Sequence, residues 1–301
     1  MTERRHREPL PLGGEHGLPF SKGLLARALI ATGVRPDRAY ELALTAEADL
    51  AAAGGKAVSL ERLHELAVEM WGEDDAAQVM RRLRLYRRID DLDLPIILLV
   101  GGATGTGKST VATEVAYRLG ITRVTSTDFV RQTMRAFFSR DFMPSIHYSS
   151  FEAGEARDED DPDRVVHGFL DQTRNVLVGV RAAIERVMQE GWSMVLEGVH
   201  LVPGMLPTEI EGALVVQFVL AIDDVEAHAS HFWFRDTTTG GVRSFDRYLD
   251  SLGDIRAIQD YIVARAEKAG VPVIENANIE AAIAKAMDLV LETAERLEPV
   301  T

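Results

Sequence analysis

A glycine-rich stretch at residues 102–109 has residue types and spacing suited to binding phosphate. It reads Gly-x-x-x-x-Gly-Lys-Ser, the spacing of a P-loop, with an apolar run before it and an amphipathic segment after it. Glycines let successive backbone N–H groups converge on phosphate oxygens, Lys108 supplies a cation for the β- and γ-phosphates, and the Ser109 hydroxyl can bind Mg²⁺. The pattern therefore predicts ATP or GTP binding by Gly102, Ala103, Thr104, Gly105, Thr106, Gly107, Lys108, Ser109 and Thr110, against the alternative of a glycine-rich turn without function.

A carboxylate, Glu197, directly follows a second apolar run, at residues 192–196. If this run is a strand, Glu197 emerges at its C-terminal edge, where a Mg²⁺–phosphate complex would lie. We therefore expect Ser109 and Glu197 to be metal ligands, with Gly198 allowing the ligand to approach closely. A carboxylate that caps a neighbouring helix would give the same local pattern.

A phosphoryl acceptor would need groups that hold it in line with the terminal phosphate, and Asp128 and Arg131 are the first candidates. If a helix starts here, Asp128 lies at its N-terminal edge and Arg131 one turn further on. Asp128 can accept the proton of an attacking hydroxyl, while Arg131 binds an acidic acceptor. The alternative is an Asp that caps the helix beside a surface Arg.

A polar loop at residues 144–151 offers further groups to an acceptor: His147, Ser149 and Ser150. The same composition is typical of turns, which is the alternative interpretation. His200, three residues after Glu197, is a further candidate for acceptor binding, with an exposed structural histidine as its alternative.

Arginines flank a Thr- and Gly-rich tip at residues 237–241 and predict a lid that closes on the phosphates. Arg235 is the candidate for stabilising the transferring charge, and Arg243 and Arg247 for binding the acceptor; Arg256 belongs to the same group. Ordinary helix-surface arginines are the alternative. The arginines between residues 81 and 88, by contrast, indicate a solvated helix face rather than a nucleic-acid site.

These residues need a scaffold, and the pattern from residue 95 onward predicts one of class α/β. Buried-looking apolar runs alternate with helical segments, which indicates a mostly parallel sheet covered by helices on both sides. The expected strands are 96–100, 123–125, 192–196, 214–222 and 271–274, and the long expected helices are 162–190 and 279–297.

The first 94 residues have a different pattern, with apolar positions three or four residues apart throughout. Helices are expected within 22–32, over 36–53, from Ser59 as N-cap to about residue 70, and over 74–86. An acidic stretch that ends in Pro95 marks the boundary. The sequence thus predicts a helical domain over 1–94 and a kinase-type domain over 95–301.

Composition limits the classes of protein to consider. Of the 301 residues, 46% are hydrophobic and 27% charged, which is typical of globular chains, and no cysteine is present to form a disulfide or bind a metal. No apolar run approaches a membrane span, and the first residues do not resemble a secretory signal, so we expect a cytoplasmic protein. The net charge of −14 argues against nonspecific nucleic-acid binding and requires any anionic ligand to meet a local cluster of cations.

Several of these stretches together resemble 2-phosphoglycerate kinases. They are residues 101–110, Ser126-Thr127-Asp128 with Arg131, His147 with Ser149 and Ser150, residues 197–204 (Glu-Gly-Val-His-Leu-Val-Pro-Gly) and residues 255–259. The similarity covers nearly the whole chain, because residues 18–27 are similar to the N-terminal ATP-cone domain that such kinases often carry. Residues 12–17 depart from that domain's basic nucleotide-binding hairpin, so the domain could be purely structural or form a dimer contact.

The resemblance implies ATP-dependent phosphorylation of the 3-hydroxyl of 2-phosphoglycerate, which gives 2,3-bisphosphoglycerate with Mg²⁺ as metal cofactor. The residues themselves leave two alternatives open. One is a P-loop kinase of another acidic or phosphorylated acceptor, such as a sugar acid, a nucleotide or a polynucleotide end. The other is a non-catalytic regulatory protein that senses ATP. The expected partner is a small phosphorylated acid rather than a membrane or a nucleic acid, and a homo-oligomer is compatible with the sequence.

Overall fold

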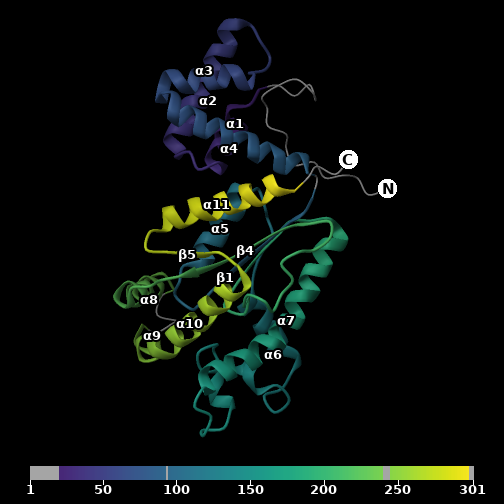
Figure 1. The fold of residues 1–301 in the computed structure, drawn as a ribbon, viewed down its shortest axis with the longest axis vertical. Coiled ribbons are helices and arrows are strands. Elements are labelled where there is room, and N and C mark those ends of the chain that lie inside the picture. Colours follow the sequence, from purple (N-terminus) through teal and green to yellow (C-terminus); the bar gives the residue numbers. More distant parts are fainter. Residues whose placement is uncertain (1–19, 93, 240–244, 298–301) are drawn as a thin grey trace. The chain divides into compact units, whose positions relative to one another are not determined.

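The computed structural model describes residues 20–92, 94–239 and 245–297, which form two compact units (Figure 1). One unit takes the described residues within 1–94, 117–120 and 287–301, and the other takes residues 95–116 and those described within 121–286. The residues at 12–17, Arg243 and the tip glycines at 240–241 lie outside the described residues.

The first unit contains the helices α1 (Lys22–Ala31), α2 (Pro36–Ala53), α3 (Leu60–Trp71) and α4 (Glu73–Asp91) and, from residue 287 on, the end of the last described helix. Ser59 caps α3 as expected, because its hydroxyl accepts a hydrogen bond from the N–H of Arg62 at 3.1 Å. Apolar side chains of all four helices form one core that includes Leu25, Leu42 and Leu83.

The second unit contains a five-stranded sheet of β1 (Ile96–Gly102), β2 (Val124–Ser126), β3 (Met194–Glu197), β4 (Leu214–Ala221) and β5 (Val273–Glu275). The strand order is β2-β3-β1-β4-β5, and every neighbouring pair is parallel. All seven residues of β1 are buried, as its position in the centre of the sheet requires. The predicted α/β class with a parallel sheet is confirmed.

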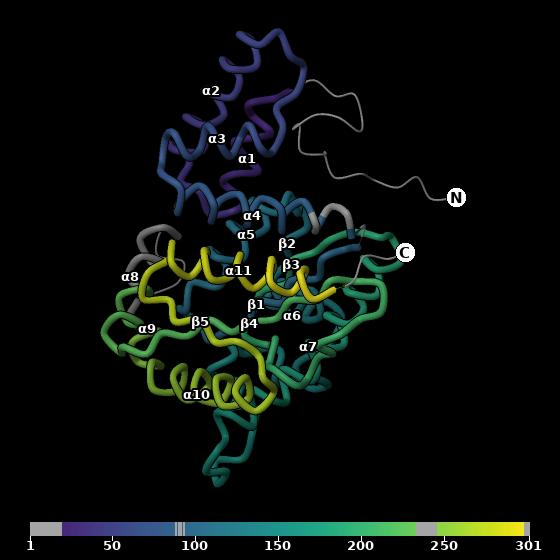
Figure 2. Tube along the Cα trace, turned by 45° about the horizontal axis from the view of Figure 1, so that its top comes forward, coloured from purple at the N-terminus to yellow at the C-terminus, as the bar shows by residue number. Residues whose placement is uncertain are grey.

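The other elements described after residue 95 are helical. They are α5 (Lys108–Arg118), α6 (Thr127–Phe137), η1 (Pro144–His147), η2 (Ala153–Ala156), α7 (Arg164–Glu190), α8 (Val225–Thr239), α9 (Phe245–Asp250), α10 (Leu252–Ala269) and α11 (Ile279–Arg296). Figures 1 and 2 show α7 and α10 along the same face of the sheet. On that face α7 packs against Ile97 and Leu99 of β1, and α10 packs against Val219 of β4. No described helix is both long enough and apolar enough to span a lipid bilayer.

The strands β3 and β5 each begin two residues later than the apolar runs at 192–196 and 271–274 predict, and the cause is the same in both. The N–H of Trp192 bonds to the carbonyl of Val187, and the N–H of Val271 bonds to that of Ala266, each at 2.9 Å. These apolar residues therefore close the preceding helix after a left-handed glycine and do not enter the strand.

Candidate functional site

The P-loop joins the end of β1 to the start of α5, so its N–H groups lie at a helix N-terminus. Gly105 and Gly107 have φ values of 88° and 81°, a region that side chains with a Cβ rarely adopt. The Lys108 side chain is buried, and its Nζ donates to the carbonyl of Ala103 at 3.0 Å. The loop thus has the fold context and the backbone curvature that phosphate binding requires.

A cavity of about 430 Å³ opens beside this loop and is lined by residues from several elements. Among the predicted site residues, the cavity brings together Thr104, Lys108, Ser109, Asp128, Arg131, Ser149, Ser150, Glu197 and Arg247. Ser126, Thr127, Gln132, Phe151, Gly198, Val199 and Tyr248 complete the lining. Three of the predicted nucleotide-binding residues therefore share this space with predicted acceptor groups, whereas Gly102, Ala103, Gly105, Thr106, Gly107 and Thr110 do not line it.

Glu197 reaches this cavity because the carboxyl ends of three strands meet there. It is the last residue of β3, and the sheet register places it beside Val100 of β1 and Ser126 of β2. Its side chain is largely buried and lines the cavity together with the exposed Ser109. A hydroxyl and a carboxylate are the oxygen donors that Mg²⁺ prefers. Within the described part of the chain, no group of three or more acidic, His or Cys side chains could hold a metal alone, so a bound cation would need further oxygens from phosphate and water.

The structure explains the glycine at position 198 by a contact within the chain, whereas the sequence suggested close approach of a ligand. A Cβ at this position, where φ is 153°, would lie 1.8 Å from Oγ1 of Thr127. The glycine thus lets the start of α6 pack against the end of β3, besides lining the cavity. It is the chain's own Thr127 that approaches closely.

Asp128 and Arg131 form an ion pair on the first turns of α6, with Arg131 Nε 3.2 Å from Asp128 Oδ1. Half of the Asp128 side chain is exposed, whereas Arg131 is buried. Desolvation would raise the pKa of Asp128, but the positive charge of Arg131, with a smaller contribution from Lys108, lowers it below the usual range. Asp128 is therefore a carboxylate at neutral pH, set in a positive local field.

The loop at residues 144–151 is tied to α6 and α7 through its backbone. Arg131 Nη1 donates to the carbonyls of Ile146 at 3.0 Å and Tyr148 at 2.8 Å. Gln172 of α7 donates from Nε2 to the carbonyls of Ser145 and Tyr148. This anchoring fixes Ser149 and Ser150 at the cavity wall.

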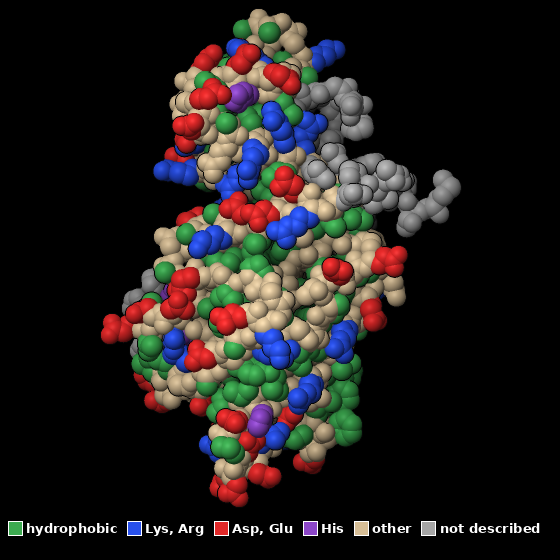
Figure 3. Space-filling model, in the orientation of Figure 1, with side chains coloured by type: hydrophobic (Ala, Val, Ile, Leu, Met, Phe, Trp, Pro, Cys, Tyr) green, Lys and Arg blue, Asp and Glu red, His purple; other side chains and the backbone are tan. Residues whose placement is uncertain are grey.

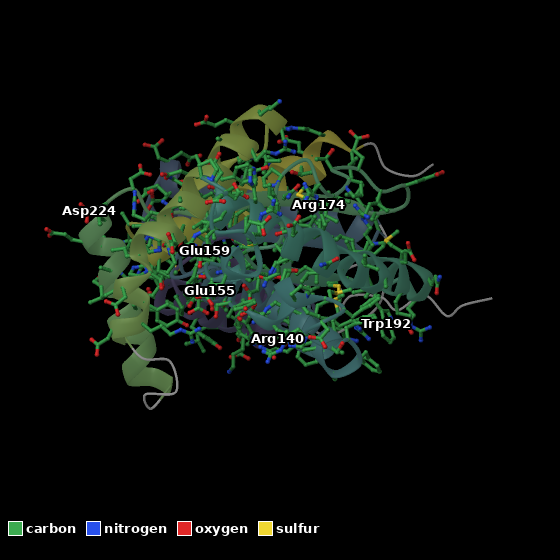
Figure 4. All side chains as sticks on the ribbon, turned by 90° about the horizontal axis from the view of Figure 1, so that it is seen from below. Arg140, Glu155, Glu159, Arg174, Trp192 and Asp224 are labelled. Carbon is green, nitrogen blue, oxygen red and sulfur yellow. The ribbon has the colours of Figure 1, made fainter. Side chains whose placement is uncertain are left out.

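Arginine side chains surround this loop on two sides. Arg247 of α9 donates from Nε to Glu152 at 2.8 Å and from Nη2 to the Ser149 hydroxyl at 3.2 Å. The hydrogen bond to Glu152 raises the pKa of Arg247, which stays charged. Arg140, labelled in Figure 4, lies with its guanidinium carbon 5.0 Å from the centre of the Tyr148 ring.

Two predicted acceptor-binding histidines do not line the cavity. His200 is fully buried, with Nδ1 2.7 Å from the Thr127 hydroxyl and Nε2 2.8 Å from Oε1 of Gln172. His147 directs its Nε2 to the carbonyl of Phe138 at 3.0 Å. The structure thus does not bring either histidine to the cavity with the other predicted acceptor groups, contrary to the expectation from the sequence.

The predicted lid is described only in part. Arg235 lies on α8, but its side chain is outside the described residues, as is all of Arg243. Arg256 of α10 bonds to the carbonyls of Ile222 and Asp223, each at 3.0 Å, and does not line the cavity. Of the four arginines, the structure therefore brings Arg247 to the cavity.

Sequence reasoning missed several residues that line or support the cavity. Gln132 lies one helical turn after Asp128, and Tyr248 directly follows Arg247, so helix periodicity and adjacency could have found them. Gln172 lies in the middle of α7, and nothing in its local sequence connects it to the loop that it anchors.

Charged side chains elsewhere on the surface are mixed in sign. Figure 3 shows both acidic and basic groups over the visible face of the described residues. The acidic stretch at 158–161 is mostly exposed, and Asp161 pairs with Arg157 and His167. This distribution suits a small anionic ligand in a local cavity better than a polynucleotide.

The burial of His200 predicts a loss of stability in mild acid. Burial lowers its pKa to about 3, whereas the unfolded residue titrates near pH 6.5, so the unfolded chain binds the extra proton between these values. The free energy of unfolding should therefore fall as the pH falls from about 6.5, by up to ~1.4 kcal/mol per pH unit from this group. Urea unfolding between about pH 7 and pH 5 should show a shallower dependence in His200→Gln than in the wild type. Equal slopes would contradict this assignment.

Comparison with known proteins gives clear relatives, although no family model matches the chain. A protein named 2-phosphoglycerate kinase from Methanopyrus kandleri is 39% identical over 278 residues, which cover 92% of this chain and 85% of the relative. Proteins of the same name from Methanothermobacter thermautotrophicus and Pyrococcus horikoshii are 40% and 35% identical and are covered over 88% and 92% of their lengths. These near full-length matches confirm the resemblance found in the sequence: the chain belongs to the 2-phosphoglycerate kinase family.

Proposed function

We propose that the chain transfers the γ-phosphate of ATP to the 3-hydroxyl of 2-phosphoglycerate, giving 2,3-bisphosphoglycerate and ADP. The observation that carries this proposal is the shared cavity, in which the P-loop lysine faces the same space as Asp128, Arg131 and Arg247. Its volume of about 430 Å³ is within the range of small-ligand sites. The names of the relatives support the choice of acceptor.

In this proposal the P-loop binds the triphosphate. Backbone N–H groups of residues 102–110 surround the β- and γ-phosphates, and Lys108 leaves its carbonyl partner to bridge them. Ser109 and Glu197 would hold Mg²⁺, which neutralises phosphate charge when bound. Both residues offer oxygen donors at the cavity wall, so the site fits this cation.

Asp128 acts on the hydroxyl that attacks. The new bond joins the 3-oxygen of the acceptor to the γ-phosphorus, and the bond from that phosphorus to the β,γ-bridging oxygen breaks. Asp128 accepts the hydrogen bond of the hydroxyl and takes its proton as the new bond forms. Because Arg131 keeps the pKa of Asp128 low, the carboxylate is a weak base, so it mainly orients the hydroxyl and the proton is transferred late.

The acceptor carries a phosphate and a carboxylate, and the cationic side of the cavity suits both. Arg131 and Arg247 supply positive charge, and the hydroxyls of Ser149 and Ser150 supply hydrogen bonds. Arg235 and Arg243 are proposed to complete this field from the lid, with Arg235 on the transferring phosphoryl group. A strongly acidic protein would thus bring two anions together at one local positive site.

The direct test is a product assay. The chain is incubated with MgATP and 2-phosphoglycerate, and phosphorus NMR identifies the product. Formation of 2,3-bisphosphoglycerate at a rate far above that with 3-phosphoglycerate or glycerate supports the proposal. Turnover with an uncharged polyol in preference to 2-phosphoglycerate, or tight ATP binding without any turnover, overturns it.

Removal of the charge at Arg247 should affect the acceptor rather than the nucleotide. In Arg247→Gln we expect the KM for 2-phosphoglycerate to rise about 10- to 100-fold, because a charge-assisted contact to an anion is lost. The KM for ATP should change less than about twofold, since Arg247 lies on the acceptor side. Steady-state kinetics check this, with Arg186→Gln, an exposed ion-pair arginine on α7, as the control. An effect confined to the KM for ATP would show that Arg247 binds the nucleotide and not the acceptor, which would contradict this prediction.

A further inference from the structure

Each carbonyl group of the P-loop from residue 103 to 107 accepts a hydrogen bond. The carbonyl of Ala103 accepts from the Thr106 hydroxyl and from Lys108, and that of Gly107 accepts from the first turn of α5. The three carbonyls between them accept from side chains that lie far away in the sequence. Because three of the donors are side chains from outside the loop, the orientation of these three peptide groups depends on residues outside it.

The three outside donors come from two elements. His228 Nε2 lies 2.8 Å from the carbonyl oxygen of Thr104, and His231 Nδ1 lies 3.0 Å from that of Gly105, both on α8. Asn276, directly after β5, donates from Nδ2 to the carbonyl of Thr106 at 2.9 Å. We name His228, His231 and Asn276 the carbonyl brace.

The protonation states of the brace follow from its partners. A carbonyl oxygen only accepts hydrogen bonds, so His228 must carry its proton on Nε2 and His231 must carry one on Nδ1. His228 is fully buried, and desolvation lowers its pKa even though the bond to Thr104 opposes this. The neutral form of His228 with hydrogen on Nε2 is therefore the donor.

The glycines of the loop provide a second, independent observation, because they show that the carbonyl brace packs closely against the loop backbone. A Cβ at Gly105 would lie 2.5 Å from the Phe232 ring and 3.0 Å from Nε2 of His228. A Cβ at Gly107 would lie 2.3 Å from Nδ2 of Asn276. These glycines thus admit the bracing side chains as well as the left-handed backbone.

We propose that His228, His231 and Asn276 are positioning residues for phosphate binding, which hold three successive P-loop carbonyls outward so that the N–H groups of the same loop face the phosphates. This inference rests on one part of the proposed function, the binding of ATP by the P-loop. It does not depend on the identity of the acceptor. None of the three lines the cavity, so the brace acts through the loop rather than by contact with the nucleotide.

The physical basis is the fixed orientation of peptide dipoles. In a phosphate cradle each N–H that points inward needs its neighbouring carbonyls to point away. Without an outside donor, a carbonyl is free to turn toward the cradle, where its negative end repels phosphate, and the N–H groups lose their preorganisation. The cost should appear in the affinity for polyphosphate.

The test measures binding of MgATP and of tripolyphosphate by calorimetry in His231→Ala, Asn276→Asp and His228→Ala. Asn276→Asp keeps the shape but places an oxygen against the Thr106 carbonyl, and His231 is only partly buried, so these two variants are the ones expected to fold. Each should raise both dissociation constants about 5- to 30-fold, because one backbone-orienting hydrogen bond is lost. The KM for 2-phosphoglycerate should stay within about twofold.

Rescue and control variants separate positioning from general damage. His228→Gln and His231→Asn keep a donor near Nε2 and Nδ1 respectively and should recover affinity to within about threefold of the wild type. Ser230→Ala, which removes an exposed hydroxyl bonded within α8, should leave affinity unchanged. Wild-type affinity for tripolyphosphate in folded His231→Ala and Asn276→Asp overturns the proposal, and so does an equal loss in the rescue variants. Because binding is measured without acceptor, failure to phosphorylate 2-phosphoglycerate would refute only the proposed function.

Discussion

Replacement of Lys108 by alanine is expected to lower kcat for phosphoryl transfer about 10³-fold or more, because the only P-loop side-chain cation would be lost from the transferring charge. The hydrogen bond from the ammonium to the Ala103 carbonyl is worth about 1 kcal/mol, and thermal unfolding of the variant shows directly that it still folds. Single-turnover assays with saturating MgATP measure the effect on chemistry directly.

The matched control is Lys268→Ala, which removes an exposed lysine from the last turn of α10. Its kcat and thermal midpoint should equal those of the wild type. If folded Lys108→Ala kept phosphoryl transfer at the wild-type rate, the P-loop would not be the nucleotide site that the proposal requires.

Asp128→Asn is expected to lower kcat about 10²- to 10³-fold while the KM for ATP stays nearly constant, since the amide keeps the size of the side chain but cannot accept the proton. The low pKa of Asp128 adds a pH signature: the group is already ionised at neutral pH, and activity should fall only in acid, as the pH drops through that lowered pKa. The kcat of the wild type should therefore show no ionisation of this group between about pH 6 and pH 8.

Asp254→Asn, an exposed acid on the first turn of α10, serves as control and should behave as the wild type does. An activity in Asp128→Asn within a fewfold of the wild type would remove Asp128 from the chemistry. Asp128 would then serve only as the ion-pair partner of Arg131, because the N-cap of α6 is Ser126, whose hydroxyl accepts the hydrogen bond of the Phe129 N–H.

The parts of the fold that were predictable depend on neighbouring residues in the sequence. Continuous apolar runs bounded by Pro or Gly locate β1 and β4, and the Gly and Lys spacing locates the P-loop between β1 and α5. Helix caps are equally local, as at Ser59. Strand order is not local, and it is the central position of β1 that brings Glu197 and Ser126 to the P-loop side of the sheet.

The parts that were not predictable depend on burial. The sequence around His200 suggests an available imidazole, but packing of α7 against the end of β3 buries it between Thr127 and Gln172. The neighbouring Glu197 is likewise buried but keeps access to the cavity. No local sequence pattern distinguishes a buried side chain that lines the cavity from one that does not. The difference depends on which side chains of other elements pack around it.

Arginines show the same limit. Arg247 and Arg256 both follow the predicted lid tip and have the same chemistry, yet one lines the cavity and the other binds two carbonyls at the end of β4. The bracing residues His228, His231 and Asn276 carried no recognisable motif, because their partners are backbone carbonyls. The P-loop motif in the sequence identifies the loop, but it does not identify the side chains that donate hydrogen bonds to the loop carbonyls.

The central claim is that one cavity holds the terminal phosphate of ATP beside a phosphorylated acid. A crystal structure with a nonhydrolysable ATP analogue, Mg²⁺ and 2-phosphoglycerate tests it most directly. We predict the γ-phosphate at Lys108, the acceptor phosphate between Arg131 and Arg247, and the 3-hydroxyl directed at Asp128. An acceptor bound elsewhere, with Asp128 turned away from the γ-phosphate, would contradict the account.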